Sequence, residues 1–253
     1  MRQFNVCDTT AARGRLEFVS VMNEPLQPIY LFADSQLLFH RNQGVLFLDS
    51  LRRHPAHDAP QAAYIGASNG DEPEFYLIFE AAMNGIGIHN CRMIPSSLTA
   101  EDEAYLSEAD IILLAGGDVA AGWNVFVETG IKDLIIRRYF EGTTLIGISA
   151  GAVQLGLCGL IDAGQPSEEL LDTFKLIPLI IDAHDEKQKW TGLKRAIRLF
   201  GGVAKGVGIT AGGGLIYYPD QSIEAVRYAL YEFSMQDGEI RDALLMPGNE
   251  GAA

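Results

Sequence analysis

The sequence predicts an α/β protein of three layers, in which helices cover both faces of a mostly parallel sheet and a β-hairpin lies near the C-terminus. Short apolar runs alternate with longer amphipathic segments from Pro28 onward, as in right-handed βαβ units. The parallel sheet that such units form is covered on both faces. Near the end of the chain, Gln236-Asp237-Gly238 separates two β-compatible runs, which indicates a hairpin.

The first part of the chain supplies the alternating elements in order. Strands are expected at Ile29–Phe32, Ala62–Ile65, Cys91–Ile94, Ile111–Leu114 and Thr144–Ile148. Helices are expected between them at Asn42–Arg53, Glu72–Asn84, Ala100–Glu108 and Val125–Phe140. The third helix has a start signal, because Ser97 and Thr99 lead into the acids Glu101 to Glu103, and acids favour the first turn of a helix.

The second part is expected to continue with one more buried strand, a basic helix and two pairs of strands. In chain order these are Leu176–Ile181, which ends at Asp182-Ala183-His184, then Lys189–Phe200, a Gly-rich pair within Gly206–Tyr218, and the hairpin of Tyr228–Met235 with Glu239–Leu245. A helix over Ile223–Phe233 is the competing interpretation, since Ile223, Val226 and Leu230 also fit a helical period.

Length and composition limit the class of protein. The chain has 253 residues, of which 48% are hydrophobic, and we expect one α/β domain over residues 28–253 after an extension of uncertain structure over residues 1–27. The formal net charge of −14 opposes binding to nucleic acid or to an anionic membrane. Three cysteines without metal-ligand spacing favour a cytoplasmic location, and neither a signal peptide nor a transmembrane run is expected.

Small, polar or Gly-containing stretches follow the expected strands. In an open parallel sheet such stretches meet at the carboxyl edge, where ligands bind. They are Asp34-Ser35, Gly66 to Asp71, Pro95-Ser96-Ser97, Gly116-Gly117-Asp118 and Ser149. We therefore expect the functional site at this edge of the sheet.

The most informative segment runs from Thr144 to Ala152, where an apolar run ends in Gly147-Ile148-Ser149-Ala150-Gly151. The pattern is typical of a nucleophile elbow, in which small neighbours let a serine stand exposed on a tight strand-to-helix turn. The amide of Ala150 would then point at a reacting carbonyl oxygen. An ordinary Gly-rich junction between strand and helix has the same local pattern, so the assignment depends on the partners of Ser149.

Ser149 needs a general base, because a serine hydroxyl is a poor nucleophile near neutral pH. Of the five histidines, His184 directly follows a buried apolar run and so shares an edge with Ser149. The others are expected in a surface loop, at the opposite edge or near the start of a helix; they are His54, His57, His89 and His40. His184 is therefore the expected base.

Several residues are candidates for the carboxylate that would orient His184, and the sequence does not decide between them. Asp162 is favoured, because it lies between Ser149 and His184 in the sequence and has apolar neighbours. The alternatives are Glu168, Glu169, Asp182 and Glu186.

Leu114 to Asp118 ends the strand that precedes the elbow and contains two adjacent glycines. Glycines allow a close backbone approach, so the Gly117 N–H would join the Ala150 N–H as paired donors to an oxyanion. Gly116 and Asp118 are expected to bind substrate beside them. An ordinary turn is the alternative interpretation.

Together, the Gly-Gly-Asp segment, the Gly147 to Ala152 elbow and Asp182-Ala183-His184 resemble serine peptidase family S51, over roughly residues 29–248. This family holds the aspartyl dipeptidase called peptidase E and the cyanophycinases. The resemblance implies a class I glutamine amidotransferase-like fold, with serine in place of the amidotransferase cysteine. It also implies Ser149 as nucleophile and His184 as base, with Asp162 placed as in peptidase E.

Two departures from the family pattern concern substrate recognition. Cyanophycinases carry an Arg-rich stretch after the histidine, whereas Asp185 to Arg195 has lysines in another pattern, and lysine does not replace arginine in bidentate carboxylate binding. The late pattern resembling G-I-D-E-x-T-A is here Gly208 to Gly214, without its acids. We therefore expect catalytic residues to carry over better than specificity.

The main expectation is a serine peptidase that hydrolyses an amide bond in a small peptide through an acyl-enzyme, without a metal or cofactor. An aspartyl dipeptide and a cyanophycin-like β-aspartyl substrate are the candidate substrates. An acidic N-terminal residue would require a cation at the site, for which Lys189, Lys194 and Arg195 are the candidates. An α/β-hydrolase-type esterase and a catalytically inactive S51-like binding module are the alternatives. The peptide cleaved and the oligomeric state, a homodimer included, stay open.

Overall fold

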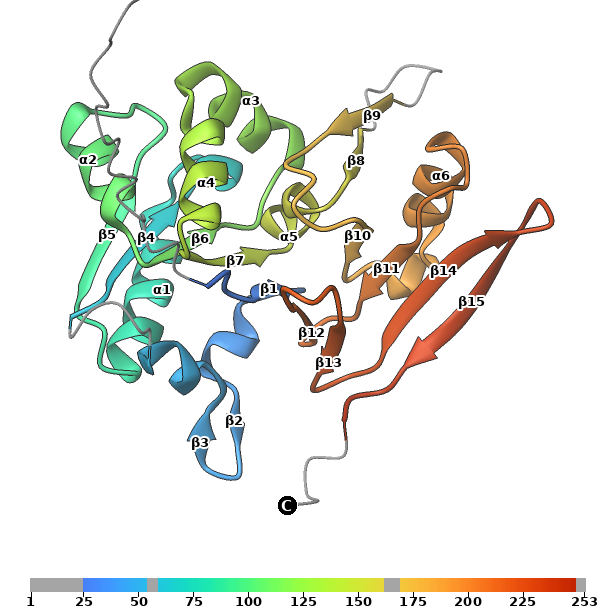
Figure 1. The fold of residues 1–253 in the computed structure, drawn as a ribbon, viewed down its shortest axis with the longest axis horizontal. Coiled ribbons are helices and arrows are strands. Elements are labelled where there is room, and N and C mark those ends of the chain that lie inside the picture. The colour runs from blue at the N-terminus through green and yellow to red at the C-terminus, as the bar shows by residue number, and fades with distance from the viewer. Residues whose placement is uncertain (1–24, 54–58, 162–168, 249–253) are drawn as a thin grey trace, which may run out of the picture.

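The computed structural model describes residues 25–53, 59–161 and 169–248, so Asp162, Glu168, His54 and His57 lie outside the described residues, as does most of the expected extension (Figure 1). The central element is a seven-stranded sheet in the order β13-β12-β1-β7-β6-β4-β5. Its parallel strands are β1 (Ile29–Phe32), β7 (Thr144–Ile148), β6 (Ile111–Leu114), β4 (Gln61–Ile65) and β5 (Asn90–Ile94). The antiparallel strands β12 (Gly214–Tyr217) and β13 (Ile223–Val226) complete one edge.

Helices cover both faces of this sheet, which confirms the predicted three-layer α/β class. Successive strand residues point to opposite faces, so Leu31 belongs to one core and the adjacent Phe32 to the other. The first core is closed by α2 (Ala100–Glu108), α3 (Val119–Thr129), α4 (Ile131–Phe140) and α5 (Ala150–Leu155). The second is closed by α1 (Pro73–Gly85) and the 3-10 helices η1 (Ser35–Phe39) and η2 (Phe47–Arg53).

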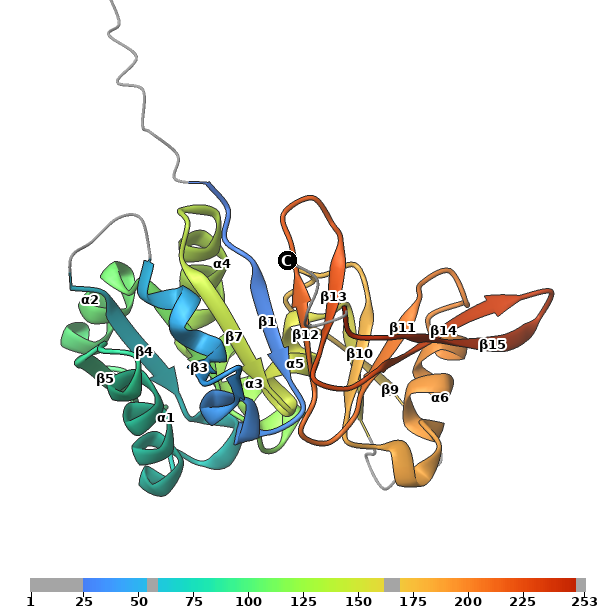
Figure 2. The ribbon, with the colours of Figure 1, turned by 90° about the horizontal axis from the view of Figure 1, so that it is seen from below.

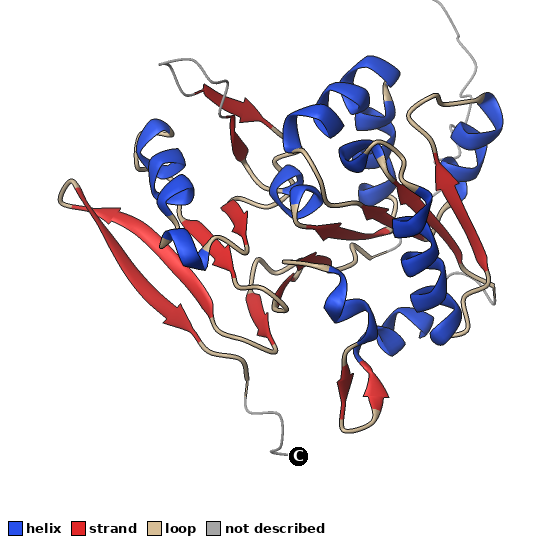
Figure 3. Cartoon of the chain, turned by 180° about the vertical axis from the view of Figure 1, so that it is seen from behind, coloured by secondary structure: helices blue, strands red, loops and turns tan. Residues whose placement is uncertain are grey.

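A smaller four-stranded sheet, in the order β10-β11-β14-β15, lies beside the central one (Figure 2). The strands β10 (Ile180–Ala183) and β11 (Gly206–Ile209) are parallel, and β14 (Leu230–Gln236) and β15 (Glu239–Leu245) form the expected hairpin. The helix that accompanies this sheet is α6 (Thr191–Leu199), whereas the other α-helices lie with the central sheet (Figure 3). Two short pairs are β2 (Arg41–Asn42) with β3 (Val45–Leu46), and β8 (Cys158–Ile161) with β9 (Glu169–Asp172).

The helix α2 begins where its start signal predicts. The Thr99 hydroxyl oxygen accepts the Asp102 N–H at 3.2 Å, and the Asp102 carboxylate accepts the Thr99 N–H at 3.1 Å. This reciprocal capping satisfies amides that have no partner inside the helix.

Two helix predictions are corrected by glycine turns. The helix expected over Asn42–Arg53 is wrong in its first part, because Gln43 and Gly44 have φ values of 48° and 86° and close a hairpin turn between β2 and β3. Only Phe47–Arg53 is helical, as the 3-10 helix η2. The single helix expected over Val125–Phe140 is two helices, because Gly130, with a φ of 77°, ends α3 and precedes α4.

Strand predictions in the second part also need correction. The Gly-rich pair expected within Gly206–Tyr218 is wrong, because β11 pairs with β10 and β14 whereas β12 pairs with β1 and β13. The turn between them carries the chain from one sheet to the other. The competing helix over Ile223–Phe233 is wrong as well, since β13 and β14 occupy that segment. The strand expected at Leu176–Ile181 begins only at Ile180.

None of the helices within the described ranges has the length and apolar character needed to cross a bilayer.

Candidate active site

Ser149 stands on a tight turn between β7 and α5. Its φ of 49° and ψ of −107° lie outside the usual regions for a residue with a side chain, and such strain concentrates at functional sites. The flanking glycines are required by close contacts. A Cβ on Gly151 would lie 2.2 Å from the Leu114 carbonyl oxygen, and one on Gly147 would lie 2.6 Å from the Gly151 carbonyl oxygen. The Gly-x-Ser-x-Gly pattern is therefore a steric requirement of this turn.

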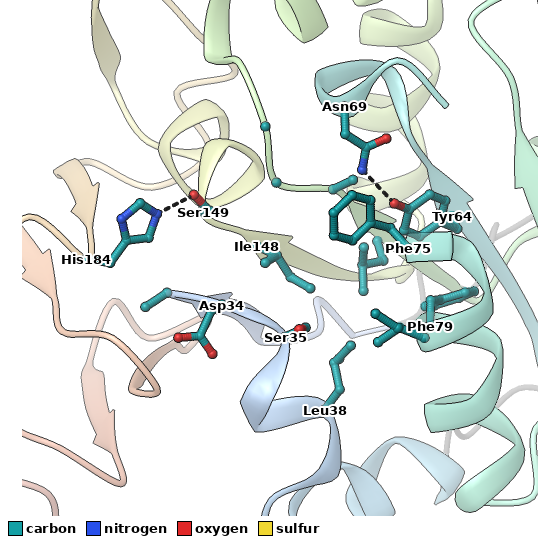
Figure 4. A pocket seen from close by; sticks show the side chains of 16 residues that line it. Asp34, Ser35, Leu38, Tyr64, Asn69, Phe75, Phe79, Ile148, Ser149 and His184 are labelled. Carbon is teal, nitrogen blue, oxygen red and sulfur yellow. Dashed lines mark hydrogen bonds between the residues drawn. The ribbon is translucent and has the colours of Figure 1, made fainter. Parts of the chain in front are cut away.

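His184 follows β10 and contacts Ser149 from the second sheet. Its backbone N–H donates to the carbonyl oxygen of Ile209 at 2.8 Å, and its φ of 48° turns the chain away from the strand direction. The imidazole Nε2 lies 2.7 Å from the Ser149 Oγ (Figure 4). This is the distance of a direct hydrogen bond between the hydroxyl and a ring nitrogen.

The backbone amides of Gly117 and Ala150 lie beside the elbow. Gly117 has a φ of 137°, and a Cβ there would lie 1.9 Å from the Ser68 carbonyl oxygen, so this conformation requires glycine. The same oxygen accepts the Asp118 N–H at 2.7 Å, which fixes the loop after β6. Within the described part of the chain, neither the Gly117 N–H nor the Ala150 N–H is engaged by a hydrogen-bond acceptor.

The two neighbours of Gly117 differ in their position. Gly116 lines the cavity at Ser149, and a Cβ there would lie 3.3 Å from the Ser149 Cβ. The Asp118 carboxylate instead accepts the Ala121 N–H at 2.8 Å and caps α3. The sequence predicts that Asp118 binds substrate, whereas in the structure its carboxylate is engaged in this helix cap.

A cavity of about 400 Å³ opens beside the Ser149 hydroxyl. Apolar and aromatic side chains form most of its wall, namely Leu38, Tyr64, Phe75, Ile78, Phe79 and Ile148 (Figure 4). Asp34 also lines the cavity, and its carboxylate accepts the Gly212 N–H at 2.7 Å and the Gln36 N–H at 2.9 Å. The first β-strand loop is thereby tied to the turn between β11 and β12.

Comparison with known proteins agrees with this geometry. Peptidase family S51 matches residues 46–222 of the 253-residue chain, a span that contains Ser149 and His184. The chain belongs to peptidase family S51.

Solved structures of two peptidases have a similar fold. One is a peptidase from an acI-B1 Actinobacterium, with 15% identity and a TM-score of 0.63, covering 88% of this chain and 96% of that chain. The other is a putative peptidase E protein from Listeria monocytogenes EGD-e, with 16% identity and a TM-score of 0.58, covering 80% of this chain and 99% of that chain. No curated protein matches the sequence.

The cations expected to bind an acidic substrate in this S51 chain lie away from the Ser149 cavity. The Lys194 Nζ donates to the Lys189 carbonyl oxygen at 2.9 Å and lies 4.9 Å from the centre of the Phe233 ring. Arg195 is exposed and lines a separate cavity that also contains Asp182. The reason is the position of α6, which packs its apolar side on the smaller sheet and so keeps these residues on that side of the molecule.

Among the described residues, no carboxylate forms a hydrogen bond with the His184 imidazole, whose side-chain partner is Ser149. The Asp182 carboxylate accepts the Ala183 N–H at 2.9 Å and lines the separate cavity. Glu186, in η4 (Glu186–Gln188), lines a small cavity with Lys189 and Lys194. Glu169 is exposed on β9. Asp162, the favoured residue, stays a prediction, as does the alternative Glu168.

Asp182 has a perturbed acidity. Burial raises the pKa of its carboxyl group to about 6, and the nearby charge of Asp185 acts in the same direction. The hydrogen bond from the Ala183 N–H and the charge of His184 oppose this rise.

Sequence reasoning missed the apolar wall of the S51 cavity. Phe75, Ile78 and Phe79 lie on α1, and Tyr64 lies on β4. Apolar residues in these elements have the periodicity of ordinary core positions, so no local signal distinguishes them. Asp34, by contrast, was expected at this edge, because it closely follows the first predicted strand. No group of three or more His, Cys, Asp or Glu side chains in the described ranges could hold a metal ion.

Proposed function

We propose that this S51 chain is a serine peptidase that hydrolyses a peptide bond of a small peptide through an acyl-enzyme. The observation that carries the proposal is the 2.7 Å contact between the Ser149 Oγ and the His184 Nε2. The strained elbow and the two unengaged amides beside it provide further support. A hydroxyl next to a base and facing paired N–H donors is the arrangement that acyl transfer requires.

Acylation starts from a neutral His184 that is protonated at Nδ1. As the Ser149 Oγ bonds to the carbonyl carbon of the peptide, its proton passes to the His184 Nε2. The carbonyl oxygen becomes an oxyanion and accepts hydrogen bonds from the N–H groups of Gly117 and Ala150. His184 then gives the proton to the amine nitrogen, the carbon–nitrogen bond breaks, and the acyl group stays on Ser149 as an ester.

Deacylation repeats these steps with water as the nucleophile. His184 takes a proton from the water while its oxygen bonds to the ester carbon. The oxyanion forms again at the same amides. When the carbon–oxygen bond to Ser149 breaks, His184 returns the proton to the Ser149 Oγ, which restores the free enzyme and releases the carboxylic acid.

The test measures hydrolysis of a dipeptide panel and labelling by a fluorophosphonate, which reacts with activated serines. Ser149→Ala should reduce turnover by at least about 1,000-fold and abolish labelling. Ser107→Ala is the matched control, because the Ser107 hydroxyl donates to the Glu103 carbonyl oxygen on α2, remote from the elbow. The control should retain full activity and labelling.

Three results would contradict the proposal. Equal turnover by the wild type and Ser149→Ala would remove Ser149 from the reaction. Hydrolysis of p-nitrophenyl esters without any peptide turnover would favour an esterase. A wild-type protein that neither cleaves peptides nor reacts with the fluorophosphonate would favour a binding module.

A further inference from the structure

The cavity beside Ser149 lies on the side that would hold the acyl part of a substrate. Figure 4 shows His184 on one side of Ser149, and Tyr64, Phe75 and Phe79 on the other. The leaving amine must accept its proton from His184 and therefore lies on the His184 side. The residue that contributes the carbonyl carbon then extends in the opposite direction, into the cavity.

The wall of the cavity has the chemistry of a hydrophobic binding pocket. Leu38 of η1 and Ile78 of α1 line it, and the Tyr64 and Phe79 rings pack with their centres 5.5 Å apart. The Tyr64 hydroxyl accepts the Asn69 side-chain N–H at 2.9 Å, so its polar end already has a partner. A volume of about 400 Å³ lies in the usual range for small-ligand pockets.

The residues that line the cavity disfavour an acidic side chain. Among the described lining residues there is no lysine or arginine, whereas Asp34 is one of them. An aspartyl side chain would lose its hydration in an apolar pocket without gaining a cation, and Asp34 would repel it. An apolar side chain meets neither penalty.

Resting on the serine peptidase function proposed above, we propose that this site selects substrates with a large apolar residue, such as phenylalanine or leucine, on the acyl side of the scissile bond. The acidic residue that the family resemblance implies is disfavoured there. Burial of a large apolar side chain in this pocket corresponds to a preference of roughly 10- to 100-fold over an acidic residue.

Binding to Ser149→Ala tests this selectivity without requiring turnover. Isothermal titration of the variant with Phe-Ala and Asp-Ala should give a dissociation constant at least about tenfold lower for Phe-Ala. Equal or tighter binding of Asp-Ala would overturn the proposal, and so would the absence of measurable Phe-Ala binding at about 10 mM, an order-of-magnitude limit for a weak ligand. Because chemistry is not measured, this result is separate from the fluorophosphonate test of the serine mechanism.

A pair of variants on α1 tests whether the cavity itself selects the residue. Phe75 is 50% exposed and lines the cavity, whereas Leu77 is 57% exposed on the same helix and does not line it. In the Ser149→Ala background, Phe75→Arg should reduce the Phe-Ala over Asp-Ala preference by at least about tenfold, because it adds a cation and removes apolar wall. Leu77→Arg should leave the preference unchanged. An equal shift in both variants would assign the effect to net charge and overturn the proposal.

Discussion

The Ser149 hydroxyl and the His184 imidazole lie 2.7 Å apart although they follow strands of two different sheets. Ser149 follows β7 of the central sheet, and His184 follows β10 of the smaller one. Contacts between the two sheets and their connecting segments set the distance between Ser149 and His184. The Leu157 N–H, just after α5, donates to the Leu179 carbonyl oxygen, just before β10, at 2.9 Å. The geometry of the site thus depends on how α5 packs against β10.

A methyl group at this junction should disturb catalysis more than folding. A Cβ on Gly156 would lie 2.8 Å from the Leu179 carbonyl oxygen, so Gly156→Ala should push β10 away from α5 and move His184. We expect kcat to fall by roughly tenfold to 100-fold and the free energy of unfolding by about 1–3 kcal/mol, measured by peptide hydrolysis and urea unfolding.

Gly85→Ala is the control for this substitution. Gly85 ends α1, and the nearest atom to a Cβ there is a Leu46 methyl group at 3.6 Å, an ordinary contact. This variant should keep its kcat and gain up to about 1 kcal/mol of stability. A Gly156→Ala enzyme with unchanged kcat would show that the junction does not control the Ser149–His184 distance.

Removal of the base should abolish acylation while the fold persists. His184→Gln should lower kcat/KM by roughly 10,000-fold or more, because the Ser149 proton would have no acceptor. His89→Gln is the control, since the His89 Nδ1 contacts the Asn84 Oδ1 at 2.6 Å on an exposed surface. Substantial fluorophosphonate labelling of His184→Gln would show that another group activates the serine.

The paired amides give a test of oxyanion stabilisation. Gly117→Ala should force the loop after β6 to move, because a Cβ would overlap the Ser68 carbonyl group at 1.9 Å. The loss of one aligned N–H donor should lower kcat by about 100- to 1,000-fold, measured with the peptide on which the wild type is most active. Gly44→Ala is the control, because Gly44 also has a positive φ, of 86°, but a Cβ added there would meet no atom within 4 Å. If both variants retain the same kcat, the Gly117 amide takes no part.

Local patterns predicted the parts of the fold and site that depend on one short segment. The glycines around Ser149 recur at fixed positions of the elbow pattern, where contacts with the turn and with the adjacent strand β6 exclude a Cβ, so the elbow could be seen in the sequence. His184 could be placed at the same edge because it follows an apolar run. By contrast, the hairpin at Gln43-Gly44 was missed, since its neighbours also fit a helical period.

No local sequence pattern indicated which strands pair when they are far apart in the sequence. The turn at Thr210 to Gly213 looks like the turn of a strand pair, yet its two strands join different sheets. Similarly, Phe79 would fill the core or line a cavity with the same sequence pattern. Asp118 lies between a strand and a helix, and the structure uses its carboxylate as a cap.

Asp182 should make the stability of the protein depend on pH. Its folded-state pKa of about 6, raised by burial, exceeds the value of about 3.9 that an aspartate has in an unfolded chain. The folded protein therefore holds this proton more tightly, and the resulting stability is complete below about pH 4 and is lost as the pH rises through about 6. Asp182→Asn carries no charge at any of these pH values and avoids the loss.

We expect Asp182→Asn to be more stable than the wild type at about pH 7.5 by on the order of 1–3 kcal/mol, with the difference shrinking toward zero near pH 4. Urea unfolding of both proteins at intervals between these two pH values measures the difference directly. Asp172→Asn is the control, because the Asp172 side chain is 77% exposed and pairs with Lys175 at the surface. A stability difference for Asp182→Asn that stays constant across this range would mean that folding does not raise the pKa of Asp182, because stability depends on pH only where the pKa differs between the folded and unfolded states.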